Sequence, residues 1–234
     1  MCVAGINEKG EFRRLYPVPF KPLRRGGGIP FRKRSWIEAR LYPPDDQRDK
    51  RAESRKVDLE TVKILGQEDY ETIRDRIQKY LSPSVGSIKK SGASLGLIKP
   101  VILGYDCSVQ STSKIDGSQL NLEGNPVTRV NLGQVSRYQF HCQDRQNCWC
   151  VDRPHFMEIH DWEANELYRN IIRTDQKVAS IREKMRKKWM DWMIEKKRDI
   201  YFMMGTHHRW KVWMIVSVLY PPKKREDQST VGIE

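Results

Sequence analysis

The apolar residues of this chain stand mostly in short runs that proline, glycine or asparagine interrupts. Residues 2–6 form one such run, residues 7–10 have the composition of a turn, and apolar side chains return at Phe12. Short runs closed by turn residues are typical of β-strands joined by hairpins. We therefore predict that the first sixty residues are rich in β-structure and open with a hairpin.

Helical spacing appears in three places. Apolar residues recur every three or four positions between residues 70 and 81, after Asp161, and again from about Thr174 to Met193. Such spacing gives a helix one buried face, and the carboxylate of Asp161 can accept from free N–H groups of a first turn. Two strands, at 200–204 and 212–220, are predicted to follow the two C-terminal helices.

These patterns predict an α+β fold with a β-rich, barrel-like core and two C-terminal helices. We expect a single domain over residues 1–222, because no internal repeat or clear linker divides it. Residues 111–134 are polar and weakly patterned, and are predicted to form a loop or an insertion. Residues 223–234 are predicted to be a flexible tail.

The charge balance restricts the partners of the protein more than its fold. The 234 residues include 43 Lys and Arg against 30 Asp and Glu, a formal net charge of +13. A polyanion, DNA or RNA, is therefore the expected partner, with an anionic membrane surface or a merely basic protein as alternatives. No apolar run approaches the roughly 18 residues that a transmembrane helix needs, and no secretory signal is recognised. We expect a cytoplasmic protein.

Three of the five cysteines lie within nine residues, and histidines follow them closely. Thiolate and imidazole groups are the preferred ligands of zinc, and close spacing in a turn lets several converge on one ion. The predicted ligands of a structural zinc knuckle are Cys142, Cys148, Cys150 and His155, with His160 as the alternative fourth ligand. The other interpretation is a turn with free thiols and unrelated histidines.

Basic residues crowd the N-terminal part of the chain. Between Lys9 and Arg40 ten basic residues stand against two acidic ones, with aromatic residues among them. Arginine binds phosphate oxygens in pairs, and aromatic faces stack on exposed bases. A second basic face lies on the last predicted helix. The predicted nucleic-acid contacts are Arg13, Arg14, Arg24, Arg25, Arg32, Lys33, Arg34, Lys187 and Lys188. The alternative is a solvated charged surface.

One turn carries groups suited to catalysis. Thr206, His207, His208 and Arg209 bring together a hydroxyl, two imidazoles and a guanidinium between two predicted strands. Histidine exchanges protons near neutral pH, so these residues would be the catalytic group of a ribonuclease. A plain hairpin turn, or a loop that contacts phosphate, explains the same residues. Overall, the sequence favours binding over catalysis.

Several segments together resemble an uncharacterised family of bacterial and archaeal proteins, often encoded near mobile elements or defence genes. The shared segments are Arg14 to Phe20 (RLYPVPF), Trp36 to Glu38, Phe140 to Cys142, Cys148, His155, Ile159 to Glu163, Leu167-Tyr168, Tyr201-Phe202, Gly205-Thr206 and Tyr220 to Pro222. In that family a Cys-Cys-His group precedes Asp-Trp-Glu, which implies a metal site; here Cys150 is an additional cysteine. The resemblance implies no established activity.

The β-rich core with a terminal apolar hairpin is also similar to the PUA/ASCH group of barrels, which bind RNA or modified bases. The first hypothesis is therefore a nucleic-acid-binding accessory protein of a prokaryotic defence or mobile-element system. The alternatives are a ribonuclease or base-modifying hydrolase that uses the Thr206–Arg209 turn, and a scaffold subunit of a protein or nucleoprotein complex.

Overall fold

The computed structural model describes residues 2–16, 18, 32–45, 49–109, 133–175, 177–207 and 210–224. Several predictions lie outside these residues. They concern Arg24, Arg25, His208, Arg209, nearly all of the loop predicted at 111–134, and the tail after residue 224.

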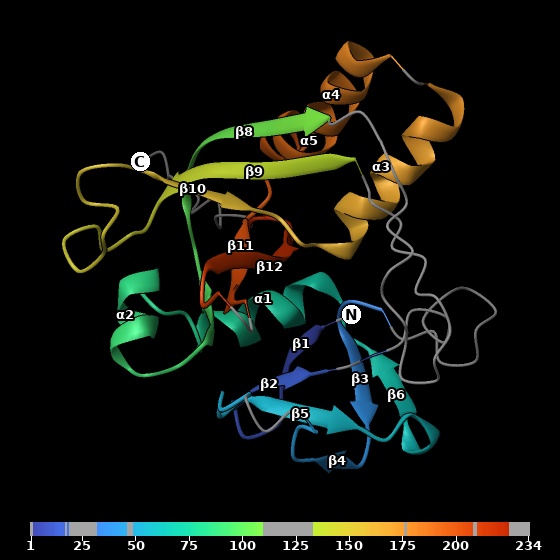
Figure 1. Ribbon diagram of the computed structural model, residues 1–234, viewed down its shortest axis with the longest axis vertical. Helices are drawn as coiled ribbons and strands as arrows, with labels where there is room; N and C mark the ends of the chain where they lie inside the picture. Colours follow the sequence, from blue (N-terminus) through green and yellow to red (C-terminus); the bar gives the residue numbers. More distant parts are fainter. Residues whose placement is uncertain are drawn as a thin grey trace, which may run out of the picture.

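The described residues form a mixed α+β structure in which strands predominate, as predicted (Figure 1). The strands are β1 (Val3–Ile6), β2 (Phe12–Leu15), β3 (Ser35–Glu38), β4 (Leu41–Tyr42), β5 (Ser54–Val57), β6 (Lys63–Gln67), β7 (Leu95–Ile98), β8 (Val101–Val109), β9 (Gln134–His141), β10 (His155–Glu158), β11 (Tyr201–Thr206) and β12 (Trp213–Leu219). The helices are η2 (Leu59–Thr61), α1 (Tyr70–Gln78), α2 (Val85–Lys90), α3 (Trp162–Thr174), α4 (Val178–Arg186), η3 (Lys187–Asp191) and α5 (Trp192–Glu195).

The strands are arranged in separate sheets. The N-terminal ones have the orders β1-β2-β5-β4 and β3-β6, and the later ones β10-β9-β8 and β12-β11-β7. Neighbours are antiparallel except β2 and β5, which are parallel. In the described part of the chain no sheet closes into a barrel, so the resemblance to PUA/ASCH barrels is not confirmed.

The predicted N-terminal hairpin is confirmed. Strands β1 and β2 pair in register from Val3 with Leu15 to Ile6 with Phe12. The turn closes through Asn7, whose carbonyl accepts from Gly10 N at 2.9 Å. Gly10 has a φ of 81°, which a residue without a Cβ adopts at little cost.

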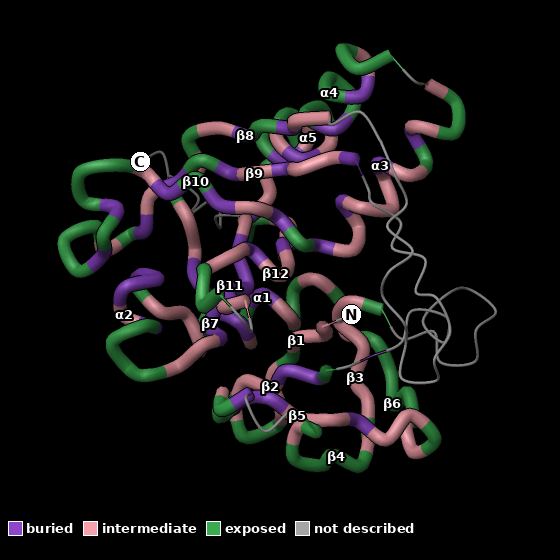
Figure 2. The backbone as a smooth tube through the Cα atoms, viewed as in Figure 1, coloured by how far each residue is buried: buried purple, intermediate pink, exposed green. Residues whose placement is uncertain are grey.

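The largest core lies in the C-terminal part of the protein. Strand β7 is buried along its whole length and β11 along all but its last residue, whereas β3, β4 and β6 are half-buried or exposed (Figure 2). At its centre the rings of Tyr138, Phe140 and Phe202 stack or meet edge to face, 5.0 and 5.1 Å apart. Sheet β10-β9-β8 and the helices α3 to α5 form one end of the molecule, and β1 to β6 form the other (Figure 1).

A smaller core joins the two ends. Ile77 of α1 packs with Leu95 and Tyr201, and Phe12 of the N-terminal hairpin packs against this group. A buried polar contact lies beside it, where Glu53 accepts from the backbone N and the hydroxyl of Ser94 at 2.7 and 2.9 Å. The N-terminal strands are thus attached through both apolar and polar contacts.

The two predicted C-terminal helices are confirmed. Asp161 caps α3 and accepts from Glu163 N at 2.8 Å. The second helix runs from Val178 to Glu195 and contains the π-helical turn η3. Its buried side is formed by Ile181, Met185, Trp189 and Met193, as the spacing predicts. No helix among the described residues is both long and apolar enough to cross a membrane.

Two local features were not predicted. Ser84 accepts from Ser87 N and caps the short helix α2. Strand β3 pairs with β6 and β4 pairs with β5, because the chain changes sheets at Ala39 and Arg40.

Candidate metal centre

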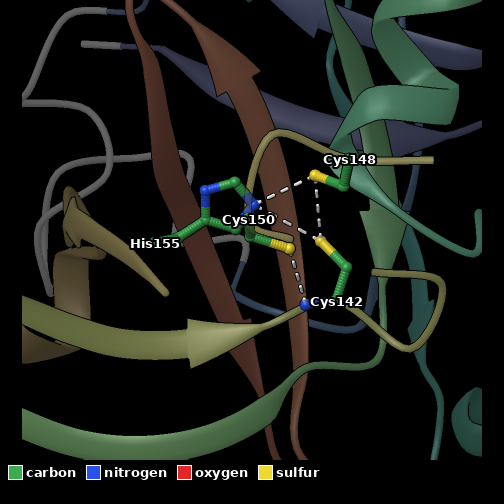
Figure 3. A group of neighbouring side chains, drawn as sticks. All are labelled: Cys142, Cys148, Cys150 and His155. Carbon is green, nitrogen blue, oxygen red and sulfur yellow. Dashed lines mark hydrogen bonds between the residues drawn. The ribbon is translucent and has the colours of Figure 1, made fainter. Parts of the chain in front are cut away.

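The predicted metal ligands come together around the start of β10 (Figure 3). Cys142 follows directly after β9, Cys148 and Cys150 lie in the connection, and His155 is the first residue of β10. We call residues 142–155 the knuckle. All four ligand side chains are buried, and their ligand atoms lie within 4.8 Å of one another. Among the described residues these four are therefore able to bind one metal ion together.

The closest contacts of the group are between ligand atoms. The Sγ atoms of Cys142 and Cys148 lie 3.7 Å apart. His155 Nε2 lies 3.5 Å from Cys142 Sγ and 3.2 Å from Cys148 Sγ. Cys150 Sγ accepts from Cys142 N at 3.5 Å, which draws the fourth ligand into the group. All five cysteines of the chain are free thiols, so none of these contacts is a disulfide.

Because the four ligand side chains are buried, the free energy of bringing them together depends on which of them are charged. Burial raises the pKa of the Cys142 and Cys150 thiols, because a thiolate loses its hydration there. It also lowers the pKa of His155 to about 4, so the imidazole is neutral near pH 7 and keeps a lone pair for a metal. A bound cation offsets the cost of gathering thiolates in this position.

Helix α2 packs directly against the knuckle. Val85 N donates to Cys142 Sγ at 3.4 Å. A Cβ at Gly86 would lie 2.0 Å from the carbonyl oxygen of Asn147, so only glycine allows this approach. The packing of α2 against the knuckle was not predicted from the sequence. The serine at position 84, a preferred helix cap, was the signal that could have revealed it.

His160, the alternative fourth ligand, lies outside the group. Its Nε2 is 3.5 Å from a carboxylate oxygen of Glu158, and its side chain is half-exposed. Burial alternates along β10 and beyond, with His155, Met157 and Ile159 inside. This period of two is the signal that separates the two histidines, because it directs His155 inward and His160 outward.

Among the predicted N-terminal nucleic-acid contacts that the structure describes, several side chains are bound to groups of the protein itself. Arg13 pairs with Glu11, and Arg14 is only 3% exposed and donates to the carbonyl of Ser94 at 2.9 Å. Lys33 Nζ lies 2.6 Å from Asp161 and 3.0 Å from Glu163. Arg14 and Lys33 therefore serve internal contacts, a correction to their predicted role, whereas Arg32 is exposed.

Basic residues from distant parts of the chain meet instead at three aromatic rings. Arg34 stacks on Tyr70 at 3.9 Å, and Lys188 lies 3.4 Å from the ring centre of Trp192. Arg198 also faces Trp192, at 5.1 Å. The group, called here the aromatic–cation cluster, consists of Lys33, Arg34, Tyr70, Lys188, Trp192, Arg198 and Tyr220. Lys187 is exposed on the adjoining helical turn.

Two buried polar atoms in this region have no hydrogen-bond partner. They are Arg198 Nε and Trp189 Nε1, and the Trp189 ring meets Tyr220 edge to face. The sequence patterns did not predict that Tyr70 and Arg198 lie together in this cluster. No local signal was available, because these residues become neighbours only through tertiary packing.

The described residues of the Thr206–Arg209 turn make hydrogen bonds and ring contacts within the protein. The carbonyl of Thr206 accepts from Arg51 Nη1 at 2.9 Å, and its N–H donates to Ser94 O at 3.0 Å. The ring of His207 stacks on Trp210 at 4.3 Å.

Comparison with known proteins divides the chain at the start of α2. Residues 1–83 match the family described as "Domain of unknown function (DUF8758)". Residues 85–232, which include the knuckle and the C-terminal helices, match the family described as "Domain of unknown function (DUF8757)". No curated protein and no solved structure matches the chain. Because the second match covers more than half of its residues, the chain belongs to the DUF8757 family.

Proposed function

We propose that this protein binds nucleic acid and that a structural zinc ion holds its knuckle together. Three thiols and one imidazole are a preferred zinc ligand set. Tetrahedral zinc, with Zn–S of about 2.3 Å and Zn–N of about 2.0 Å, places two sulfurs about 3.8 Å apart and sulfur and nitrogen about 3.5 Å apart. The contacts of Cys142 at 3.7 and 3.5 Å agree with these values. Four protein ligands leave no open position for substrate, which favours a structural role.

Metal analysis of the purified protein tests the zinc proposal. We expect about one zinc per chain, and unfolding at a lower temperature after treatment with a strong chelator. Cys148→Ser should release the metal, whereas Cys107→Ser, at a buried cysteine outside the knuckle, should retain it. A zinc content below about 0.2 per chain, with stability unchanged by chelator, contradicts the proposal.

The nucleic-acid proposal rests on the aromatic–cation cluster. Three of its cationic side chains, Arg34, Lys188 and Arg198, come from two regions more than 150 residues apart in sequence and gather at the rings of Tyr70 and Trp192. Asp161 and Glu163 neutralise Lys33, but in the described part of the chain neither Lys188 nor Arg198 forms a salt bridge with a carboxylate. Free cations beside aromatic faces suit phosphates and bases.

The environment of Lys188 supports an anionic ligand. Burial is the main cause that lowers the pKa of this lysine, with Arg198 and Lys33 acting in the same direction and Glu163 opposing them. A phosphate in this position would favour the charged lysine and remove repulsion among the three cations. The same effect links binding to salt concentration, because each phosphate contact displaces condensed counterions.

Fluorescence anisotropy with a labelled oligonucleotide tests the binding proposal. We expect affinity to fall steeply with salt, and Lys188→Gln plus Arg198→Gln to weaken binding at least tenfold. The slope of log affinity against log salt should decrease by about 0.9 for each lost contact with duplex DNA. Lys56→Gln plus Lys63→Gln removes the same charge from the N-terminal sheets and serves as the control. Binding that is independent of salt, or equally weak in both variants, contradicts the proposal.

The cellular setting is part of the proposal. A thiol-ligated metal site requires reduced cysteines, which the cytoplasm maintains. The resemblance to proteins encoded near mobile elements and defence genes supports a role as an accessory protein of such a system.

A further inference from the structure

Trp149 stands between two of the metal ligands, Cys148 and Cys150, yet it is not part of the core. Its side chain is 47% exposed. Its ring meets the ring of His155 edge to face at 5.2 Å, and Lys89 Nζ lies 5.6 Å from its centre. Leaving a large apolar ring in water forfeits the free energy of burying it, although single exposed side chains of this kind are common on surfaces. The residues around Trp149 indicate whether the exposed ring can bind a ligand.

An open groove of about 470 Å³ runs beside this ring. One wall is the last turn of α2, with Lys89 and Lys90, and the other is the knuckle from Gln146 to Trp149. Gly86 completes the lining. The groove thus combines a flat aromatic face, two ammonium groups and side-chain amides.

Direct contacts hold the walls of the groove in place. Asn147 joins them, because its Oδ1 accepts from Lys90 Nζ at 3.1 Å and its Nδ2 donates to Asp144 at 2.9 Å. At Gly86 the helix α2 touches the knuckle directly, because a Cβ there would lie 2.0 Å from the carbonyl oxygen of Asn147. A bound metal would add a further restraint on both sides of Trp149. A platform held in this way loses little conformational freedom when a ligand binds.

We infer that Trp149 stacks on an unpaired nucleobase while Lys89 and Lys90 contact the phosphates that flank it. Every nucleobase has a π-face that stacks on an indole ring, and a duplex hides these faces between neighbouring pairs. The inference rests on the proposed function and narrows its substrate to single-stranded nucleic acid, or to an unpaired segment within a longer molecule.

Comparing single-stranded and duplex probes of equal length tests this inference. The probes are a 15-nucleotide oligothymidylate, the matching oligouridylate, and a 15-base-pair DNA duplex, each measured by anisotropy at one salt concentration. Trp149→Ala should weaken binding of the single strands about tenfold and leave duplex binding within about twofold. Trp149→Phe retains an aromatic face and should stay within about threefold of the unchanged protein.

Trp210 supplies the matched control. It is 73% exposed, lies between β11 and β12, and is not among the residues that line the groove. Trp210→Ala should leave all three affinities unchanged. Oligothymidylate should also quench the indole fluorescence of the unchanged protein more than that of Trp149→Phe. The variant lacks the indole ring that stacks on the base. The two single-stranded probes distinguish DNA from RNA as the preferred source of the base.

The outcomes separate this inference from the proposed function. If Trp149→Ala binds single strands as well as the unchanged protein does, or loses affinity for strand and duplex alike, the stacking role is overturned. If Lys188→Gln plus Arg198→Gln still weakens binding in that case, the proposed function stands. If the unchanged protein binds none of the three probes at low salt, both fail.

Discussion

At the scale of single residues, the role of a charged side chain depends on the groups that it contacts. Lys33 lies in the basic N-terminal segment, but its ammonium group contacts Asp161, Glu163 and the carbonyl of Val218. The carboxylate of Asp161 is completely buried and also accepts from Val218 N at 2.7 Å. A buried carboxylate needs these partners, because it has lost its hydration. Lys33 is therefore part of the internal structure.

We expect Lys33→Ala to lower the free energy of unfolding by about 3 kcal/mol, since Asp161 would keep a buried charge without its cation. Urea denaturation followed by circular dichroism measures the change. Lys63→Ala is the control, because its pair with Glu38 is exposed on both sides and should contribute less than about 1 kcal/mol. Equal losses in the two variants would contradict the internal role of Lys33.

At the scale of elements, the last helix is shaped by a contact from the neighbouring sheet. The π-helical turn η3 interrupts the α-helical hydrogen bonds between α4 and α5. The hydroxyl of Tyr138, on β9, donates to the carbonyl of Trp189 within this turn. Turns of this kind are frequent at functional sites, and this one places Lys188 and Trp192 in the aromatic–cation cluster.

Tyr138→Phe should cost about 1–3 kcal/mol of stability, because the carbonyl of Trp189 would lose a buried hydrogen bond. Tyr105→Phe should cost less. The Tyr105 hydroxyl bonds to Ser136 Oγ, which also donates to Gln134 at 3.0 Å and keeps that partner. Urea unfolding of both variants provides the comparison, and a loss in Tyr138→Phe no larger than that in Tyr105→Phe would contradict this expectation.

At the scale of the whole molecule, the N-terminal strands are joined to β11 by a charged pair. Arg51 donates to the carbonyl of Thr206, and Asp49 binds the Arg51 guanidinium through two contacts of 2.6 Å. Burial raises the pKa of Asp49, but the hydrogen bonds from Arg51 outweigh it and lower the pKa to about 2. The ordinary value is 3.8, so the folded protein holds this carboxylate in its charged form.

The pH dependence of stability follows from that direction. A carboxyl group with a lowered folded-state pKa stabilises the protein above its unfolded pKa, and the contribution is lost as the pH falls through the folded value. We expect Asp49 to contribute about 2 kcal/mol at pH 7 and to lose most of it between about pH 4 and pH 2. In urea titrations at several pH values, Asp49→Asn should lack this loss, whereas Asp45→Asn, at an exposed pair, should retain it. Identical pH profiles for Asp49→Asn and the unchanged protein would rule the contribution out.

Local patterns predicted a large part of this structure. The N-terminal hairpin, the cap at Asp161, the buried side of the last helix and the four knuckle ligands each depend on residues close together in sequence. Turn chemistry, helix capping, helical periodicity and ligand spacing act over such short distances. The choice between His155 and His160 needed one further local feature, the alternation along β10.

The tertiary structure alone decided which basic residues remain available. Lys33 and Asp161 are 128 positions apart, and Arg14 and Ser94 are 80 apart, so no local pattern reveals that these cations are already paired. The meeting of Arg34 with Tyr70, and of Lys188 and Arg198 with Trp192, likewise depends on how distant elements pack. The free energy of a charge depends on its burial and its partner, and both are set by contacts that exist only after the chain has folded.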